Sequence, residues 1–163
     1  MPARLDRKLL RKLDELVDRG LYVSRSDAVR DAVRRIVVQA MEKEINYPTL
    51  HRLVADVASQ LIVENMKAVT DVILYGSVAR GESSSESDID LLVLVSDRDE
   101  WESESKLYDL LYPVMLSSGQ VLTIYVLNRM TYRKLFLGGS SFARGIVKEG
   151  VQLHGSILDE VRG

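Results

Sequence analysis

Two aspartates at the start of an apolar segment have the side chains and the spacing of a pair of metal ligands. Asp88 and Asp90 flank Ile89, and the apolar run continues to Val95. Side chains alternate along a strand, so both carboxylates point to one side while Ile89 points into the core. Adjacent carboxylates repel each other unless a cation lies between them, and hard oxygen ligands select Mg²⁺ or Mn²⁺. The pair therefore predicts a divalent metal site that could hold the phosphates of a nucleotide.

A second chemical feature ends the preceding apolar run. Val72–Tyr75 is followed by Gly76 and Ser77, with Arg80 close behind. A residue without Cβ lets the backbone approach a phosphate, and the Ser77 hydroxyl and nearby amides can donate to phosphate oxygens. Arg80 adds a cation. Each piece alone is as consistent with a plain turn or strand start, but the combination favours a nucleotide-binding site at Gly76, Ser77 and Arg80.

The elements that must position these residues follow from the hydrophobic periodicity. Short apolar runs indicate buried strands at 72–75, 89–95, 121–127 and 151–154, and helices are predicted at 100–115 and 142–148. A helix is expected to begin near Pro48 and end near Ala68. Its expected buried face consists of Leu50, Leu53, Val54, Val57, Leu61 and Ile62. The fold class is therefore α/β (α+β), with a small mixed sheet.

Two more helices are predicted before Pro48. Asp6 can cap a helix that runs to Arg19, with Leu5 packed on Leu10, and Gly20 ends it. A second helix begins after Ser24 with an apolar stripe made by Val29, Ala32, Val33, Ile36, Val37 and Ala40. Short helices cannot bury such stripes alone, so this segment is expected to form a homodimer or to pack on the rest of the chain. We place the domain boundary between segments 1–45 and 46–163.

The composition narrows the class of protein. The chain has 163 residues, 46% of them hydrophobic, a formal net charge of −2 and no cysteine. Disulfides and thiolate metal sites are excluded, and no apolar run is long enough to span a membrane. We expect a cytoplasmic protein without a membrane partner. The first 40 residues hold ten basic and six acidic side chains, so only this part has a charge suited to nucleic acid.

The motif around the two aspartates resembles that of a known superfamily. Gly76-Ser77, ten intervening residues and Asp88-Ile89-Asp90 are similar to the signature of the DNA polymerase beta-like nucleotidyltransferases. Ala79-Arg80-Gly81 and the segment Phe142–His154 resemble its minimal nucleotidyltransferase (MNT) branch. The resemblance implies a mixed sheet with flanking helices, Mg²⁺ on Asp88 and Asp90, and ATP phosphates at Gly76 and Ser77.

One position departs from the superfamily pattern. Active members place a third carboxylate on the next core strand, where it holds metal and accepts a proton. In this chain, the strand at 121–127 has no acid, and we expect Thr123 to occupy that place. A hydroxyl cannot take up a proton near neutral pH, so a missing base costs ~10²–10⁴ in rate. Asp97 and Glu100 are the alternative acids that could serve in its place.

The first 45 residues resemble a ribbon-helix-helix domain. The resemblance rests on Arg4-Leu5-Asp6 and on the segment from Tyr22 to Val33. It implies a dimer whose paired N-terminal strands enter the major groove, with the second helix directed at phosphate. The ribbon is short, which leaves Arg4 to contact a base, and Ser24 and Arg25 as further candidate DNA-binding residues.

Together these features predict a nucleotidyltransferase that moves a nucleoside monophosphate from ATP to a hydroxyl. The MNT resemblance implies that the acceptor is a Tyr or Ser of a HEPN-type ribonuclease toxin, which would make the protein an antitoxin. The alternative is a non-catalytic regulator that binds nucleotide or toxin and uses its first domain on operator DNA. His51, His154 and Trp101 are isolated in the sequence and are expected to have surface or packing roles.

Overall fold

The structure is a computed structural model that describes residues 7–96 and 100–163. The chain divides into two compact units, Met1–Ile45 and Asn46–Gly163. No helix in the described part of the chain combines the length and the apolar character needed to cross a bilayer.

The N-terminal unit contains the two expected helices, α1 (Arg7–Asp18) and α2 (Arg25–Glu44). At the end of α1, Gly20 has a φ of 71° and donates its amide to the carbonyl of Val17 at 2.9 Å. This left-handed conformation favours glycine, which confirms the predicted end of the helix. At the start of α2, the Ser24 hydroxyl accepts the amide of Asp27 at 3.2 Å, as the capping motif predicts. The contacts expected of Asp6 and Leu5 lie outside the described residues.

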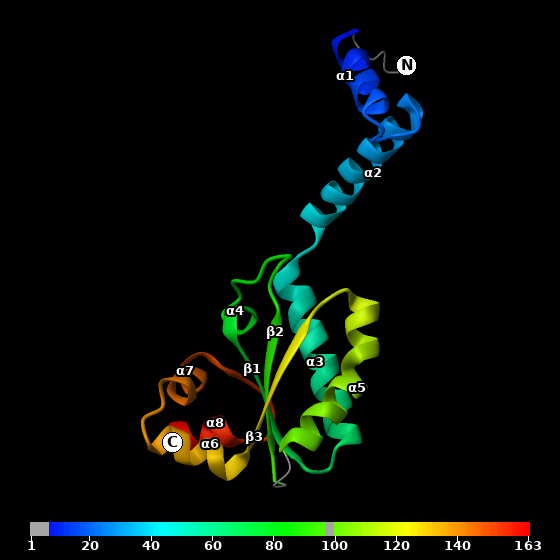
Figure 1. Cartoon of the computed structure of the whole chain (residues 1–163). Coiled ribbons are helices and arrows are strands. Elements are labelled where there is room, and N and C mark those ends of the chain that lie inside the picture. The colour runs from blue at the N-terminus through cyan, green and yellow to red at the C-terminus, as the bar shows by residue number, and fades with distance from the viewer. Residues whose placement is uncertain (1–6, 97–99) are drawn as a thin grey trace. The chain divides into compact units, whose positions relative to one another are not determined.

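The C-terminal unit is built on a mixed four-stranded sheet, as predicted (Figure 1). The strand order is β3-β2-β1-β4, and β1 runs antiparallel to both of its neighbours, whereas β2 and β3 are parallel. The strands are β1 (Val69–Tyr75), β2 (Ile89–Val95), β3 (Leu122–Asn128) and β4 (Val151–His154).

Helices cover both faces of this sheet (Figure 1). One face carries α3 (Tyr47–Asn65) and α5 (Glu100–Ser118), and the other carries α6 (Arg129–Leu137), α7 (Ser141–Glu149) and α8 (Ile157–Arg162). A short helix, α4 (Gly76–Ala79), follows β1 directly. Coverage on both faces explains why β1 and β2 have nearly continuous apolar sequences. Successive residues of these strands point alternately into the core on one face and the core on the other.

The structure corrects the prediction for the third helix. Leu53 and Val57 were expected in the core, but their side chains are 59% and 42% exposed. The buried face of α3 is instead formed by His51, Val54, Ala55, Ala58, Ser59 and Ile62. Apolar residues occupy more of this helix than one packed face can cover, and the small alanines allow close approach to the sheet. The helix also ends at Asn65 rather than near Ala68.

Candidate active site

Asp90 lies at the start of β2, the strand between β1 and β3. Its backbone is in register with Tyr75 on β1 and with Thr123 on β3. Residues in register on neighbouring strands project from the same face of a sheet, so Thr123 and Asp90 share a face. The carboxylate of Asp90 is half-buried, whereas Asp88, just before the strand, is exposed.

Gly76 connects the end of β1 to α4 in a conformation that only glycine adopts readily. Its φ is 74°, and a Cβ built on it would overlap the Oδ2 atom of Asp90. The glycine is therefore required both by its backbone angle and by the close approach of the carboxylate. Ser77 follows in the first turn of α4 and is half-buried. The structure thus brings Gly76 and Asp90, fourteen positions apart in the sequence, into one site.

Among the described residues, no basic side chain offsets the negative charge of Asp90. Burial, with Asp88 as a second cause, raises the pKa of Asp90 above its ordinary value. Burial also raises the pKa of Tyr75 to about 12, with Asp90 contributing. A divalent cation would relieve both effects, and two carboxylates are oxygen ligands that suit Mg²⁺. The donor set therefore fits the expected metal.

Thr123 lies where the sequence predicts it, and no third acid accompanies it among the described residues. Its neighbours Leu122 and Ile124 are buried in the core on the opposite face of the sheet, so Thr123 faces the side of Asp90. Among the described residues, no group of three His, Cys, Asp or Glu side chains could hold a metal ion. The two carboxylates at 88 and 90 are thus the acidic part of this site.

The alternative acid Glu100 is a wrong candidate. Its Oε1 accepts the amide of Asn128 at 2.6 Å, at the end of β3. Val95 at the end of β2 is in register with Asn128, so Glu100 lies at the opposite end of β2 from Asp90. Asp90 and Val95 are five positions apart, which corresponds to about 16 Å along the strand. Asp97, the other candidate, lies outside the described residues.

Arg80 lies beside the site but is engaged by two carboxylates. Its Nε donates to Glu82 at 2.8 Å and its Nη1 to Glu149 at 3.2 Å. These exposed pairs are weak and could be exchanged for a phosphate. Arg80 also lines a cavity of about 220 Å³ next to Gly76, which is completed by Tyr75, Ser141, Phe142, Gly145, Ile146 and Glu149.

An aromatic cluster next to the site was not predicted. Phe142 contacts Tyr75 and Tyr125 edge to face, with ring centroids 5.9 and 5.5 Å apart. Tyr125 follows Thr123 by two positions, so it projects from the same face of β3. The three rings come from β1, β3 and α7. The only sequence signal was the alternation along the two strands.

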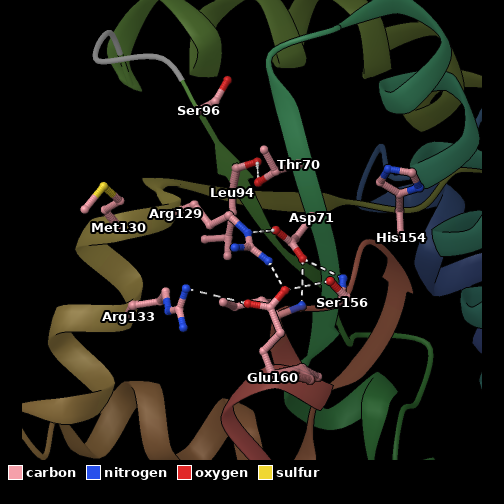
Figure 2. Close-up of polar contacts among 12 residues, drawn as sticks. Thr70, Asp71, Leu94, Ser96, Arg129, Met130, Arg133, His154, Ser156 and Glu160 are labelled. Carbon is pink, nitrogen blue, oxygen red and sulfur yellow. Dashed lines mark hydrogen bonds and ion pairs between the residues drawn. The ribbon is translucent and has the colours of Figure 1, made fainter.

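A buried charge network at the other end of β1 was also missed (Figure 2). Asp71 is fully buried, and its carboxylate accepts Arg129 Nε at 2.8 Å and the amides of Ser156 and Ile157 at 2.9 Å each. Arg129 also bonds to Glu160. These contacts tie β1 to the starts of α6 and α8, so the network is structural. An acid inside the apolar run 69–75 was the available signal.

Opposing effects act on the carboxyl group of Asp71. Burial alone would raise its pKa, but the hydrogen bonds from Arg129 and the two amides outweigh burial, and the pKa is lowered. Asp71 therefore carries a negative charge that its partners stabilise. This contrasts with Asp90, whose charge has no such partners in the described part of the chain.

The candidate DNA-binding residues have mixed outcomes. Arg4 lies outside the described residues. Ser24 caps α2, and Arg25 forms an ion pair with Asp14 of α1 through both carboxylate oxygens. The guanidinium of Arg25 thus links the two helices. Contact with phosphate by Ser24 or Arg25 stays a prediction.

Two segments of the chain match known protein families. Residues 59–136 match the family described as polymerase beta, nucleotidyltransferase. Residues 3–40 match the family described as ribbon-helix-helix protein, copG family. The chain therefore contains a nucleotidyltransferase domain of the polymerase beta type preceded by a ribbon-helix-helix domain, as the motifs predicted.

Solved structures to which the chain is similar include toxin–antitoxin complexes. A mutant of MntA-HpeT is 18% identical with a TM-score of 0.48, covering 66% of this chain and 78% of that chain. A toxin–antitoxin with AMP-PNP is 21% identical, with a TM-score of 0.44 and coverages of 63% and 74%. A tri-AMPylated Shewanella oneidensis HEPN toxin in complex with MNT antitoxin is 19% identical, with a TM-score of 0.44 and coverages of 69% and 78%. No curated protein sequence matches the chain.

Proposed function

We propose that the unit 46–163 binds Mg·ATP and transfers its nucleoside monophosphate to a hydroxyl acceptor. The observation that carries this proposal is the approach of Gly76 to the carboxylate of Asp90. A backbone turn that can hold phosphate then lies directly against a carboxylate that can hold the phosphate's counter-ion. A plain strand–turn–helix junction has no need of that proximity.

Each residue has a distinct role in the proposed reaction. Asp88 and Asp90 would hold the metal, which would stabilise the negative charge on the transferring nucleotidyl group. The Ser77 hydroxyl and amides of the turn at Gly76 donate to phosphate oxygens, and Arg80 exchanges its glutamate partners for phosphate. The acceptor oxygen bonds to the α-phosphorus as the bond to pyrophosphate breaks. The acceptor proton leaves to water, because the Thr123 hydroxyl cannot act as base, and this limits the rate.

The acceptor that we propose is a Tyr or Ser hydroxyl on a HEPN-type toxin. This follows from the resemblance of the motif at 76–90 to the MNT branch. Modification of a toxin by its antitoxin would block toxin activity covalently. In this proposal the protein is a cytoplasmic antitoxin that works as a homodimer through residues 1–45.

A second candidate is supported by Thr123. A site that lacks a third acid beside Asp90 can bind nucleotide without transferring it. The protein would then be a regulator that binds nucleotide or toxin and uses its ribbon-helix-helix domain on operator DNA.

Incubation with α-labelled ATP, Mg²⁺ and a HEPN protein separates these functions. Label on the HEPN protein, absent with the Asp88→Asn/Asp90→Asn variant, supports the transferase. Saturable binding of ATP without transfer supports the regulator. A chain that transfers no label and binds neither the nucleotide nor the HEPN protein contradicts both.

A further inference from the structure

An apolar stripe runs along the outer side of α5. Trp101, Tyr112 and Leu116 are 80%, 58% and 67% exposed. Together with Ser105 and Tyr108, they are spaced by four, three, four and four residues. This spacing places all five on one side of a helix. We call these five residues the α5 stripe.

The α5 stripe is separate from the core face of the same helix. The sheet-facing side of α5 buries Ser103, Leu107 and Leu111. Tyr108 is intermediate, and its hydroxyl accepts the amide of Ile124 on the edge strand β3 at 3.2 Å. A hollow of about 220 Å³ lies along the stripe and is lined by Trp101, Glu104, Ser105, Tyr108 and Asp109. Exposed aromatic rings around a hollow are typical of protein interfaces.

The neighbouring helix α3 also exposes apolar residues. Leu53 and Val57 of α3 are exposed instead of buried, and α3 lies next to α5 on the same face of the sheet (Figure 1). A hydrogen bond of 2.6 Å between His51 Nε2 and Gln120 Oε1 aligns the start of α3 with the end of α5.

The charges around this surface are mostly negative. Beside the stripe, α5 carries three acidic residues, Glu102, Glu104 and Asp109, and one basic residue, Lys106. Lys106 forms an ion pair with Glu102 of its own helix at 2.6 Å. An apolar centre with an acidic rim results.

We propose that the α5 stripe docks an amphipathic helix of another protein whose apolar face is flanked by lysines or arginines. Opposite charges at the rim steer and orient such a helix, and the aromatic rings provide the buried anchors. A second copy of the chain would place acidic rims against each other. Nucleic acid and anionic lipid would be repelled in the same way. This surface does not depend on the proposed nucleotide chemistry.

Trp101 allows a direct test, because it is the single tryptophan of the chain. We would titrate the full-length protein with a synthetic helical peptide that has leucines at helical spacing flanked by lysines. We expect saturable binding with a blue shift of the tryptophan emission. An isomer of that peptide with its residues scrambled, and an analogue with glutamates for lysines, should bind at least about tenfold more weakly.

Two exposed substitutions make the test specific. Tyr112→Ser with Leu116→Ser should weaken binding of the lysine peptide at least about tenfold. The control is Leu137→Ser, which removes a leucine that is 80% exposed on α6, on the other face of the sheet, and should leave binding unchanged. The proposal is overturned if the lysine peptide leaves the emission unchanged or if the glutamate peptide binds equally well. Self-association that Leu116→Ser abolishes would assign the stripe to a second copy and also overturn it.

Discussion

Thr123 is the residue at which the proposed site departs from the pattern of active nucleotidyltransferases. Its side chain shares a sheet face with Asp90, and the strands fix that placement. The alternation along 121–127 was enough to predict this orientation from the sequence, because Leu122 and Ile124 needed the core. The same alternation says nothing about Glu100, because sequence distance does not reveal at which end of the strands its side chain lies.

We predict that Thr123→Asp tightens Mg²⁺ binding about tenfold and raises any transfer rate by up to ~10². The new carboxylate adds both a metal ligand and a proton acceptor beside Asp90. Calorimetric titration with Mg²⁺ and the labelled-ATP assay measure the two effects. A variant that folds like the parent yet changes neither quantity would show that position 123 is not part of the metal site.

Asp71 should be the carboxylate that stabilises the fold most. We predict that Asp71→Asn lowers the free energy of unfolding by about 3 kcal/mol, because it breaks a buried ion pair with Arg129. Urea denaturation at neutral pH measures this loss. The exposed carboxylate Asp109 provides a control, and Asp109→Asn should leave the urea midpoint nearly unchanged.

The Asp71 contribution should also depend on pH in a defined direction. Its folded-state pKa is lowered, so the stabilisation is present above the unfolded value of about 3.9 and is lost as pH falls through the folded value. The parent protein and Asp71→Asn should therefore converge in stability in acid. A difference that stays constant from pH 7 to strongly acidic pH would argue against this assignment.

At the scale of elements, the turn between β1 and α4 can be tested with two glycines. Gly76 and Gly81 have φ values of 74° and 72°, but only at Gly76 would a Cβ meet Asp90. Gly76→Ala and Gly81→Ala should thus cost similar backbone strain, about 1 kcal/mol. Only Gly76→Ala should also reduce binding of Mg·ATP, at least about tenfold, because it displaces the carboxylate.

Calorimetric titration of both alanine variants with Mg·ATP makes this comparison. Equal affinities for Gly76→Ala and Gly81→Ala would mean that the approach of Gly76 to Asp90 is unrelated to nucleotide binding. Thermal melting of both proteins provides the accompanying comparison of strain.

Sequence reasoning found the helices and strands whose apolar residues are also their buried residues. The strands β1, β2 and β3 and the helix α2 appear within a few residues of their expected bounds. Helices α6 and α8 were missed because they have only nine and six residues, which is too few turns for a clear periodicity. The buried face of α3 was misplaced because Ala55 and Ala58 give little hydrophobic signal, although small residues pack closest to a sheet.

In the whole chain, we expect the N-terminal unit to hold two copies together and the C-terminal unit to bind the nucleotide. The exposed apolar residues of α2, among them Val33, Ile36 and Met41, find no cover within the described part of the N-terminal unit. We predict that these residues hold two chains together. A chain that begins at Asn46 should fold and sediment as a smaller oligomer than the full protein. An unchanged oligomeric state would assign the contact to the C-terminal unit.

Binding of Mg·ATP to the parent and to Asp88→Asn/Asp90→Asn tests the central claim most directly. Burial and Asp88 raise the pKa of Asp90, so replacing both charges should not lower the melting temperature in the absence of metal. Isothermal titration at neutral pH should show saturable binding to the parent and none to the double variant, whose fold is intact. A double variant that binds Mg·ATP with the affinity of the parent would contradict the assignment of the site.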